Sequence, residues 1–511
     1  VGVILASLSA GSVAAAVGYL NARRSETRAL AAQEETAAVN EFLREVLASP
    51  RPTESGREVK VVEVLEQAAG VLDQRFEAQP RVRAATRLIL GRSYEAMGDP
   101  VAAEPLLSTA RDEFGRLVGP GAADTIVASA YLGRALADQQ RLDEADAILR
   151  EALVQAQTAG DPEILIEVQR ARYLVAFHGE DFEAAERRLQ EIFDTIPPDT
   201  PDFEPTRKVA ELDLVNLLNA RGELQRAEAL AREVLDWSLG YNGPRHGNTL
   251  AARHHLAIAL DRQGRYAESG ALFVENYETA RSWLGIADRY TMNALAGVAS
   301  NLTLQGRGDE AQDYLELLVD VTHEVYGDEH EITLVAATNL STQLRENGDF
   351  TGAETLLRDT LDRVEATHGP QHRLAHINRF NLAELLFLRG RYADAAAVAE
   401  TARRSMHATL GEEHLFTLVT DAVLGASLAL VGDSGGEELL RATVDRERKV
   451  LGPTHPNTLD GRTLLALVVY EKGDRTTALG LLEEVLAESR DVLGADHPQT
   501  LKAAELLASW R

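Results

Sequence analysis

The sequence predicts an all-α solenoid of about ten helix-turn-helix hairpins, and three observations support this prediction. Glycines in a recurrent loop phrase lie 42 residues apart from Gly243 to Gly411, then 41 residues to Gly452 and 42 to Gly494. A second set of glycines keeps the same phase at Gly222, Gly264, Gly306, Gly348, Gly390, Gly432 and Gly473. Aromatic residues make up only 5% of the chain although 45% of it is apolar, which fits helices built on Ala and Leu. A fixed period of this length indicates stacked repeats.

Each repeat is expected to hold a helix A, a tight glycine turn, a helix B and a longer loop. The loop is clearest at Leu493–Leu501, where it has the sequence Leu-Gly-Ala-Asp-His-Pro-Gln-Thr-Leu. Glycine accepts the left-handed conformation that ends a helix. Proline suits the first position of the following helix, where the backbone N–H has no intrahelical partner. Each 42-residue unit is therefore predicted to be one hairpin.

Composition excludes some functions. A chain of 511 residues exceeds one ordinary core, but a solenoid has no such limit because each repeat packs on its neighbours. The net charge of -28 excludes nucleic acid as a partner, because nothing here could neutralise a run of phosphates. The absence of cysteine excludes disulfides and thiol chemistry but leaves the compartment open. Most of the acidic surface is expected to be solvated.

Residues 1–20 are uncharged and long enough to cross a bilayer, so we expect a transmembrane helix there. A signal peptide is the alternative, but the segment lacks a basic start and a clear cleavage site. A chain that begins with Val1 is expected to be part of a longer protein. Small residues recur at every fourth position from Gly2 to Gly18, a pattern by which two membrane helices can pair, so a homodimer is a further hypothesis.

The remaining boundaries follow the repeat pattern. Residues 21–80 form a helical juxtamembrane segment, 81–200 hold degenerate hairpins, 201–497 form the regular array, and 498–511 supply a capping helix. A terminal helix of this kind covers the last exposed apolar face of a solenoid. The proline-rich stretch at 196–201 is either a flexible joint or a rigid spacer.

A search for catalytic and metal-binding motifs finds no convincing site. His323-Glu324 and His330-Glu331 begin like a zinc-protease motif, but both lack the second histidine. His372 and His376 could share a helix face and bind a metal, yet no carboxylate stands as a further ligand. We therefore expect no catalytic residue, no metal and no cofactor.

Two resemblances refine these expectations. The loop phrase, together with Asn381-Leu382-Ala383 and Gly390-Arg391-Tyr392, resembles the kinesin-light-chain-type tetratricopeptide repeat (TPR). This resemblance implies a TPR superhelical solenoid that binds a protein or peptide ligand in its concave groove. Asn40-Glu41-Phe42-Leu43, Val64-Leu65-Glu66-Gln67-Ala68 and the adjoining apolar span resemble the membrane-proximal region of bacterial transmembrane serine/threonine protein kinases.

The kinase resemblance implies a location but no activity for these residues. In that family the kinase domain is cytoplasmic and the TPR array follows the span, so the array would lie outside the cytoplasm on a single-pass protein of the bacterial inner membrane. Arg23-Arg24 favours the opposite side by the positive-inside tendency. The chain contains no Gly-rich loop, His-Arg-Asp or Asp-Phe-Gly motif, so no catalytic residue is transferred to it.

The candidate ligand-binding residues lie on helix A. Asn339 and Asn381 match the asparagine of the family's Asn-Leu-Ala motif, while His255 and Gly297 replace it in other repeats. Asn301 and Gln343 follow one helical turn later on the same face. These amides either contact a ligand, tie adjacent repeats together or are solvated. The leading hypothesis is a membrane-tethered sensor or interaction region of a receptor kinase, and the alternative is an anchored scaffold without a kinase.

Overall fold

The structure, a computed structural model, describes residues 37–38, 41–42, 44, 61–197, 200–495 and 497–511. Within these ranges the secondary structure is helical and contains no strand, which confirms the all-α prediction. The predicted membrane span at residues 1–20 lies outside the described residues. None of the helices that are described combines the length and the apolar character needed to cross a bilayer.

The chain divides into two compact units, unit 1 at Val1–Thr291 and unit 2 at Met292–Arg511. The helices of unit 1 are α2 (Val61–Arg75), α3 (Pro80–Ala96), α4 (Pro100–Val118), α5 (Ala123–Asp138), α6 (Leu142–Ala159), α7 (Pro162–His178), α8 (Phe182–Thr195), the short η1 (Pro201–Phe203), α9 (Glu204–Arg221), α10 (Leu224–Tyr241), α11 (Gly247–Arg262) and α12 (Tyr266–Leu284). The boundary falls near the start of α13 (Arg289–Leu304). Unit 2 continues with α14 (Gly308–Tyr326), α15 (Glu331–Glu346), α16 (Phe350–Thr367), α17 (Arg373–Leu388), α18 (Tyr392–Thr409), α19 (Leu415–Leu430), α20 (Gly436–Val450), α21 (Pro456–Glu471), α22 (Arg475–Val492) and α23 (Pro498–Trp510).

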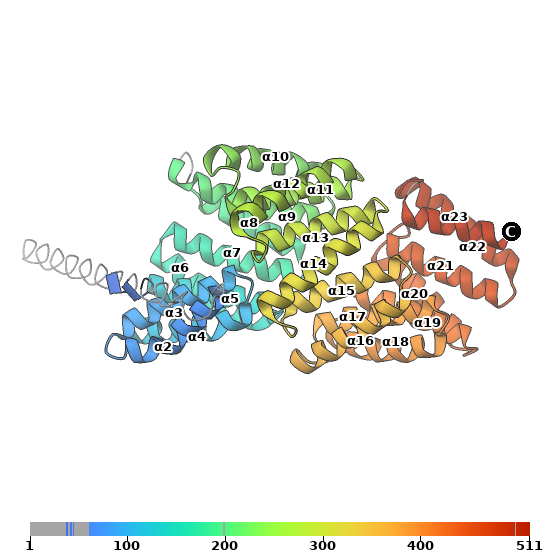
Figure 1. The fold of residues 1–511 in the computed structure, drawn as a ribbon, viewed down its shortest axis with the longest axis horizontal. Helices are drawn as coiled ribbons and strands as arrows, with labels where there is room; N and C mark the ends of the chain where they lie inside the picture. Colours follow the sequence, from blue (N-terminus) through green and yellow to red (C-terminus); the bar gives the residue numbers. More distant parts are fainter. Residues whose placement is uncertain (1–36, 39–40, 43, 45–60, 198–199, 496) are drawn as a thin grey trace, which may run out of the picture. The chain divides into compact units, whose positions relative to one another are not determined.

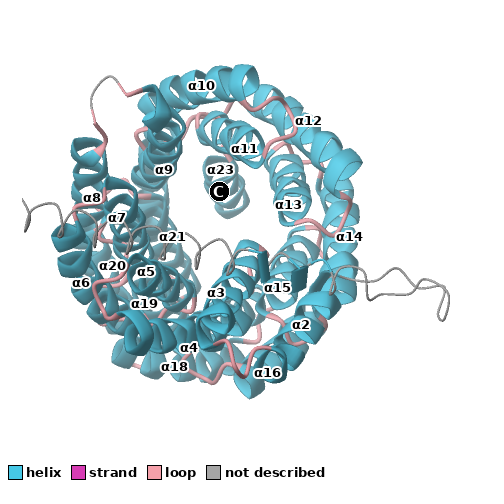
Figure 2. Cartoon of the chain, turned by 90° about the vertical axis from the view of Figure 1, so that its left-hand side faces the viewer, coloured by secondary structure: helices cyan, strands magenta, loops and turns pink. Residues whose placement is uncertain are grey.

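From α3 onward the helices pair into hairpins, with each odd-numbered helix as helix A and the next as helix B (Figure 1). Contacts between helix A and helix B are found in nine such pairs of the described chain, α13 and α14 follow one another in the same order, and α23 packs on α22. Within unit 1, α9 and α11 lie on the inner side of α10 and α12 (Figure 2). In this part of unit 1 the A helices α9 and α11 therefore carry the inner surface.

The turn between A and B helices requires one residue in the left-handed conformation. Glycine occupies this position at Gly222 (φ 76°) and in every later hairpin. In the degenerate hairpins Gln140 (φ 61°) and Glu180 (φ 57°) take it instead. A side chain at such a φ costs about 1–2 kcal/mol, so these two turns are strained relative to the regular ones.

The histidine of the loop phrase is the N-cap of the next helix A. In each case Nδ1 accepts the backbone N–H of the residue two positions on, at 3.2–3.3 Å, as seen for His246, His330, His372, His414, His455 and His497. The threonine three residues later can bond back to the loop glycine, as Thr249 does to the Gly243 carbonyl at 2.8 Å. The motif is thus a capping device that satisfies backbone groups left open at the helix start.

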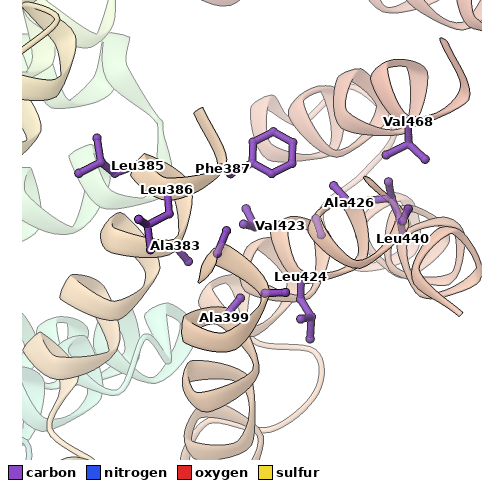
Figure 3. Close-up of a cluster of buried hydrophobic side chains, with 14 of the residues drawn as sticks. Ala383, Leu385, Leu386, Phe387, Ala399, Val423, Leu424, Ala426, Leu440 and Val468 are labelled. Carbon is purple, nitrogen blue, oxygen red and sulfur yellow. The ribbon is translucent and has the colours of Figure 1, made fainter. Parts of the chain in front are cut away.

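Small residues at the helix crossings allow the backbones to approach closely. Figure 3 shows a cluster of buried side chains to which α17, α19, α20 and α21 contribute Leu385, Leu424, Leu440 and Val468, respectively. At the α19/α20 crossing a Cβ on Gly425 would lie 2.8 Å from the Leu440 backbone nitrogen, and one on Gly436 would lie 2.2 Å from that of Ala429. Only glycine permits this approach.

Ion pairs connect consecutive hairpins through their turns. Glu354 on α16 accepts hydrogen bonds from Arg389 at 2.5 Å and Arg391 at 2.9 Å, both at the turn of the following hairpin. Equivalent pairs join Glu104 to Arg141, Glu228 to Arg265 and Glu437 to Lys472. Each pair links nearest neighbours only, as expected in a repeat solenoid.

At the N-terminal end, helical residues before α2 cover the first hairpin. The Phe42 side chain is 2% exposed and lies against Phe76 with ring centroids 5.4 Å apart. Ala38 packs against the same cluster, which includes Leu72 and Leu90. The part of the predicted juxtamembrane segment that is described is therefore packed onto the array.

Glu447 is an ionisable group buried without a hydrogen-bond partner. Its side chain is fully buried on α20, and neither carboxyl oxygen has a partner among the described residues. Burial, with a smaller effect from Asp460, raises the pKa of Glu447 to about 8. The equivalent position in other repeats holds a small or apolar residue, namely Ser238, Ala280, Thr322, Val364, Met406 and Ser489.

We expect Glu447→Gln to raise the unfolding temperature at about pH 8.5 and to change it little at about pH 5. The unfolded chain releases the Glu447 proton near the ordinary pKa of 4.5, whereas the folded state keeps it up to a pH of about 8. The wild-type protein therefore loses stability as pH rises through that window. Glutamine has no proton to lose. Thermal unfolding followed by circular dichroism at both pH values measures the difference, and an equal shift at both would contradict the burial argument.

Candidate functional site

The predicted ligand position occurs once in each helix A, and its chemistry changes along the chain. The residues at this position are Asp213, His255, Gly297, Asn339, Asn381, Val423 and Leu464. From α9 onward it is therefore charged or ionisable in α9 and α11, a glycine in α13, an amide in α15 and α17, and apolar in α19 and α21. A single continuous row of amides does not exist.

In unit 1 a row of ion pairs, which we call the charged row, joins successive A helices. Arg134 on α5 donates to Glu95 on α3 at 2.7 Å and to Glu167 on α7 at 3.0 Å. Arg170 on α7 donates to Asp213 on α9 at 2.9 Å. Each guanidinium therefore holds one A helix to its neighbour, and the row forms a paired polar surface.

The charged row is partly withdrawn from water. Arg134 lies over the ring of Tyr131, with the guanidinium carbon 4.9 Å from the ring centroid. Burial, with Glu167 as the next cause, raises the pKa of Tyr131, so its hydroxyl stays protonated at neutral pH. The Arg134 Nε is buried and has no hydrogen-bond partner among the described residues. The sequence does not reveal this row, because its first members lie in hairpins that lack the regular motif.

His255 is half-buried next to His254 on α11. Burial lowers the pKa of His255 to about 4, so its imidazole is neutral at physiological pH. Its Nδ1 is buried and has no hydrogen-bond partner in the described part of the chain. The backbone carbonyl of His255 accepts a hydrogen bond from Asn219 at 3.0 Å, which ties α11 to α9. Its role toward a ligand stays a prediction.

Asn339 and Asn381 are the two sequence-predicted residues whose amides are available. Asn339 is exposed on α15 and Asn381 is partly exposed on α17, and neither amide has a partner among the residues that the structure describes. Between these helices Arg345 forms an ion pair with Glu384. Two free amides on adjacent A helices, with a charged pair alongside, form a surface that can donate to and accept from a peptide backbone.

Asn301 and Gln343 are in a different environment, since their side chains are only 2% and 3% exposed. Gln305 donates to the Asn301 carbonyl oxygen at 2.6 Å. Gln343 accepts from Thr303 on α13 at 2.5 Å and donates to Asn347 at 2.8 Å. The structure thus brings Gln343 into a network that ties adjacent repeats, which was the alternative interpretation of these amides.

The residues considered for metal binding do not form a site. The rings of His368 and His372 stack at 4.8 Å, and His376 is buried beside Thr409, with Nε2 3.2 Å from the hydroxyl. No group of three histidine, aspartate or glutamate side chains that could hold a metal ion occurs in the described ranges.

Comparison with protein families identifies the repeats. The model described as "Tetratricopeptide repeat" matches residues 208–284, 290–366 and 336–406, and two further models with the same description match 458–499 and 126–151. Comparison with curated proteins gave no match.

Several solved structures are similar to this chain. Nearly identical TPR-like repeats of a kinesin light chain from Podosopora anserina share 21% identity, with a TM-score of 0.36, over 40% of this chain and 98% of theirs. BtubC (BKLC) from P. vanneervenii shares 20% identity, with a TM-score of 0.38, over 45% and 91% of the two chains. A STAND protein with a tetratricopeptide repeat sensor from Pyrococcus horikoshii shares 13% identity, with a TM-score of 0.49, over 92% and 70%.

Two substitutions one helical turn apart on α15 separate a free amide from a structural one. Gln343→Ala is expected to lower the free energy of unfolding by about 1–3 kcal/mol, because it removes the hydrogen bonds that the buried Gln343 side chain makes with Thr303 and Asn347. Asn339→Ala is expected to stay within about 0.5 kcal/mol of wild type, because its amide is exposed and unbonded. Urea unfolding measures both. A loss at Asn339 as large as that at Gln343 would mean that Asn339 is structural.

Proposed function

Because this chain belongs to the tetratricopeptide repeat family, we propose that it is a non-catalytic interaction region that binds a protein or peptide along its A helices. The observation that carries the proposal is the pair of free amides Asn339 and Asn381 on neighbouring A helices. Each amide offers a donor and an acceptor, so it can pair with a backbone N–H and a backbone carbonyl of an extended segment.

Such contacts would supply affinity without distinguishing one peptide sequence from another. Selectivity would come from the groups beside the amides. The Arg345–Glu384 pair can exchange partners with charged side chains of a ligand, and Leu464 on α21 continues the same repeat position with a partly exposed apolar side chain. We infer that the preferred segment is extended, carries charge toward the end that faces α15 and α17 and is apolar toward the end that faces α21.

We further propose that the region is tethered to a membrane through residues 1–20 and derives from a bacterial transmembrane serine/threonine kinase. The uncharged run of residues 1–20 supports the tether. The resemblance of residues 40–43 and 64–68 to that kinase family supports the parentage. By the domain order of the family, the array would lie outside the cytoplasm at the inner membrane. The alternative is an anchored scaffold without a kinase.

The packing of Phe42 on Phe76 supports a route for a signal in this proposal. Residues just before α2 share a core with the first hairpin. A displacement of that hairpin would therefore also displace the segment that leads to the proposed span. The effect could also be to bring two chains together. No part of this route needs chemistry in the array itself.

A photoreactive residue at position 339 should crosslink the native partner, whereas one at Thr355 should not. Asn339 is exposed on helix A, and Thr355 is exposed on α16, the helix B of the same hairpin. Crosslinks are read by mass spectrometry after illumination of cells that express the full chain. Equal capture at both positions, or capture only from position 355, would place the interface elsewhere.

The kinase parentage is tested by the codons upstream of Val1 in the same reading frame. We expect a Gly-rich loop, a strand lysine, His-Arg-Asp and Asp-Phe-Gly in that order. A different upstream domain would contradict the kinase parentage and favour the anchored scaffold.

A further inference from the structure

A pocket of about 450 Å³ opens in unit 1 between α4 and α6, with α5 as its floor. Figure 2 shows α4 and α6 on the outer side of α5, so within unit 1 the pocket opens away from the inner side of α5. Its walls and floor include Gly115, Arg116, Ile126, Ile148, Glu151 and Gln155.

The pocket exists because a side chain is missing at Gly115. This residue lies four positions before the loop glycine Gly119, and Thr125 bonds the Gly119 carbonyl at 2.8 Å just as Thr249 bonds that of Gly243. In the regular repeats the equivalent position always has a large side chain, namely Leu239, Arg281, His323, Glu365, His407, Arg448 and Arg490. Compared with these seven repeats, only the first hairpin has no side chain at this position.

Packing does not require glycine there. A Cβ on Gly115 would meet only the Thr125 methyl, at 3.9 Å, which is an ordinary contact. By contrast, a Cβ on Gly91 or Gly133 would lie 2.6 Å from a leucine side chain. Gly115 lies within α4, where glycine destabilises a helix by about 0.5–1 kcal/mol relative to alanine. Gly115 therefore weakens α4 and opens a pocket, although close packing does not require a glycine at this position.

The lining has an apolar floor between two opposite charges. Ile126 and Ala152 are buried at the base. Arg116 on α4 and Glu151 on α6 are exposed on the two walls, and neither has an ion pair or hydrogen bond among the described residues. Nearby Arg111, by contrast, is paired with Asp112. The pocket thus presents an unpaired cation, an unpaired anion and apolar surface at once.

We propose that this pocket binds a short free peptide with aliphatic side chains. Its carboxylate would pair with Arg116, its amino group with Glu151, and a side chain would cover Ile126 and Ile148. A volume of this size falls in the range of small-ligand pockets. A ligand with one charge would leave one wall unpaired, and a second copy of this chain is disfavoured by the net charge of -28. A short free peptide carries both a charged amino group and a charged carboxylate, whereas the terminus of a protein chain offers only one of these two groups.

The pocket shares no residue with the A-helix surface, so peptide binding there is independent of the proposed function. A peptide bound between α4 and α6 would contact both B helices and the start of α5. It would therefore act as an added contact between the first two hairpins.

The probe is the dipeptide leucyl-leucine, titrated into the full chain by calorimetry. We expect saturable binding that becomes about tenfold weaker or worse when the amino group is acetylated or the carboxylate is amidated, since each change removes one charged partner. Glu151→Gln should abolish the preference for the free amine, and Arg116→Gln the preference for the free carboxylate. A response to amidation or acetylation alone would overturn the free-peptide assignment.

Two substitutions at one site supply the control for folding. Gly115→Gln fills the pocket and should abolish binding, while Gly115→Ala leaves most of it open and should retain binding within about threefold. Both should unfold at or above the wild-type temperature, because each replaces glycine within a helix. No binding at millimolar dipeptide, or unchanged binding by Gly115→Gln, would overturn the proposal.

Discussion

The array depends on how closely the two helices of each hairpin approach one another. Where Gly425 crosses Leu440 and Gly436 crosses Ala429, a single added carbon would collide with backbone atoms. The same constraint appears elsewhere as fully buried alanines such as Ala353 and Ala395. So tight a crossing contains many dispersion contacts. The loop glycine and the capping histidine end one helix and start the next, so that the following pair of helices can form its own crossing. Stability is therefore local, and ion pairs such as Glu354–Arg391 extend it from one hairpin to the next.

This local construction leaves the A-helix surface free to vary. At one repeat position the chain changes from Asp213, paired with Arg170, through the unbonded Asn339 to the apolar Val423. Asp213 and Asn339 lie outside the helix crossing, so a change between them leaves the hairpin unaltered, whereas Val423 is buried in the core cluster of α17, α19, α20 and α21. An interaction region needs this independence, since its ligand preference can change while its fold stays constant. The outer pocket at Gly115 is a second case, in which a position outside the crossing has no side chain and the helices still pack.

The fold could be predicted from sequence because its signals repeat. The spacing of Gly222 and its successors marks the turns, and each is a left-handed residue in the structure. The site was less predictable. Asn301 and Gln343 share a helix face with the candidate position, yet their amides are bonded within the array, because burial depends on how the neighbouring hairpin packs. The charged row of Glu95, Arg134 and Glu167 joins three hairpins without a common motif, so no period could reveal it.

By itself the sequence determined the helical class, the hairpin unit, its period and the positions of its turns. These follow from short-range rules, since a glycine, a capping histidine or a small residue acts within a few residues of its own place. Only the tertiary structure decided which polar side chains are bonded, which are free and where a pocket opens. Those outcomes depend on side chains 40 residues apart, as with Thr303 and Gln343, and no local pattern encodes such a distance. The empty place at Gly115 is visible only when α4, α5 and α6 are seen together.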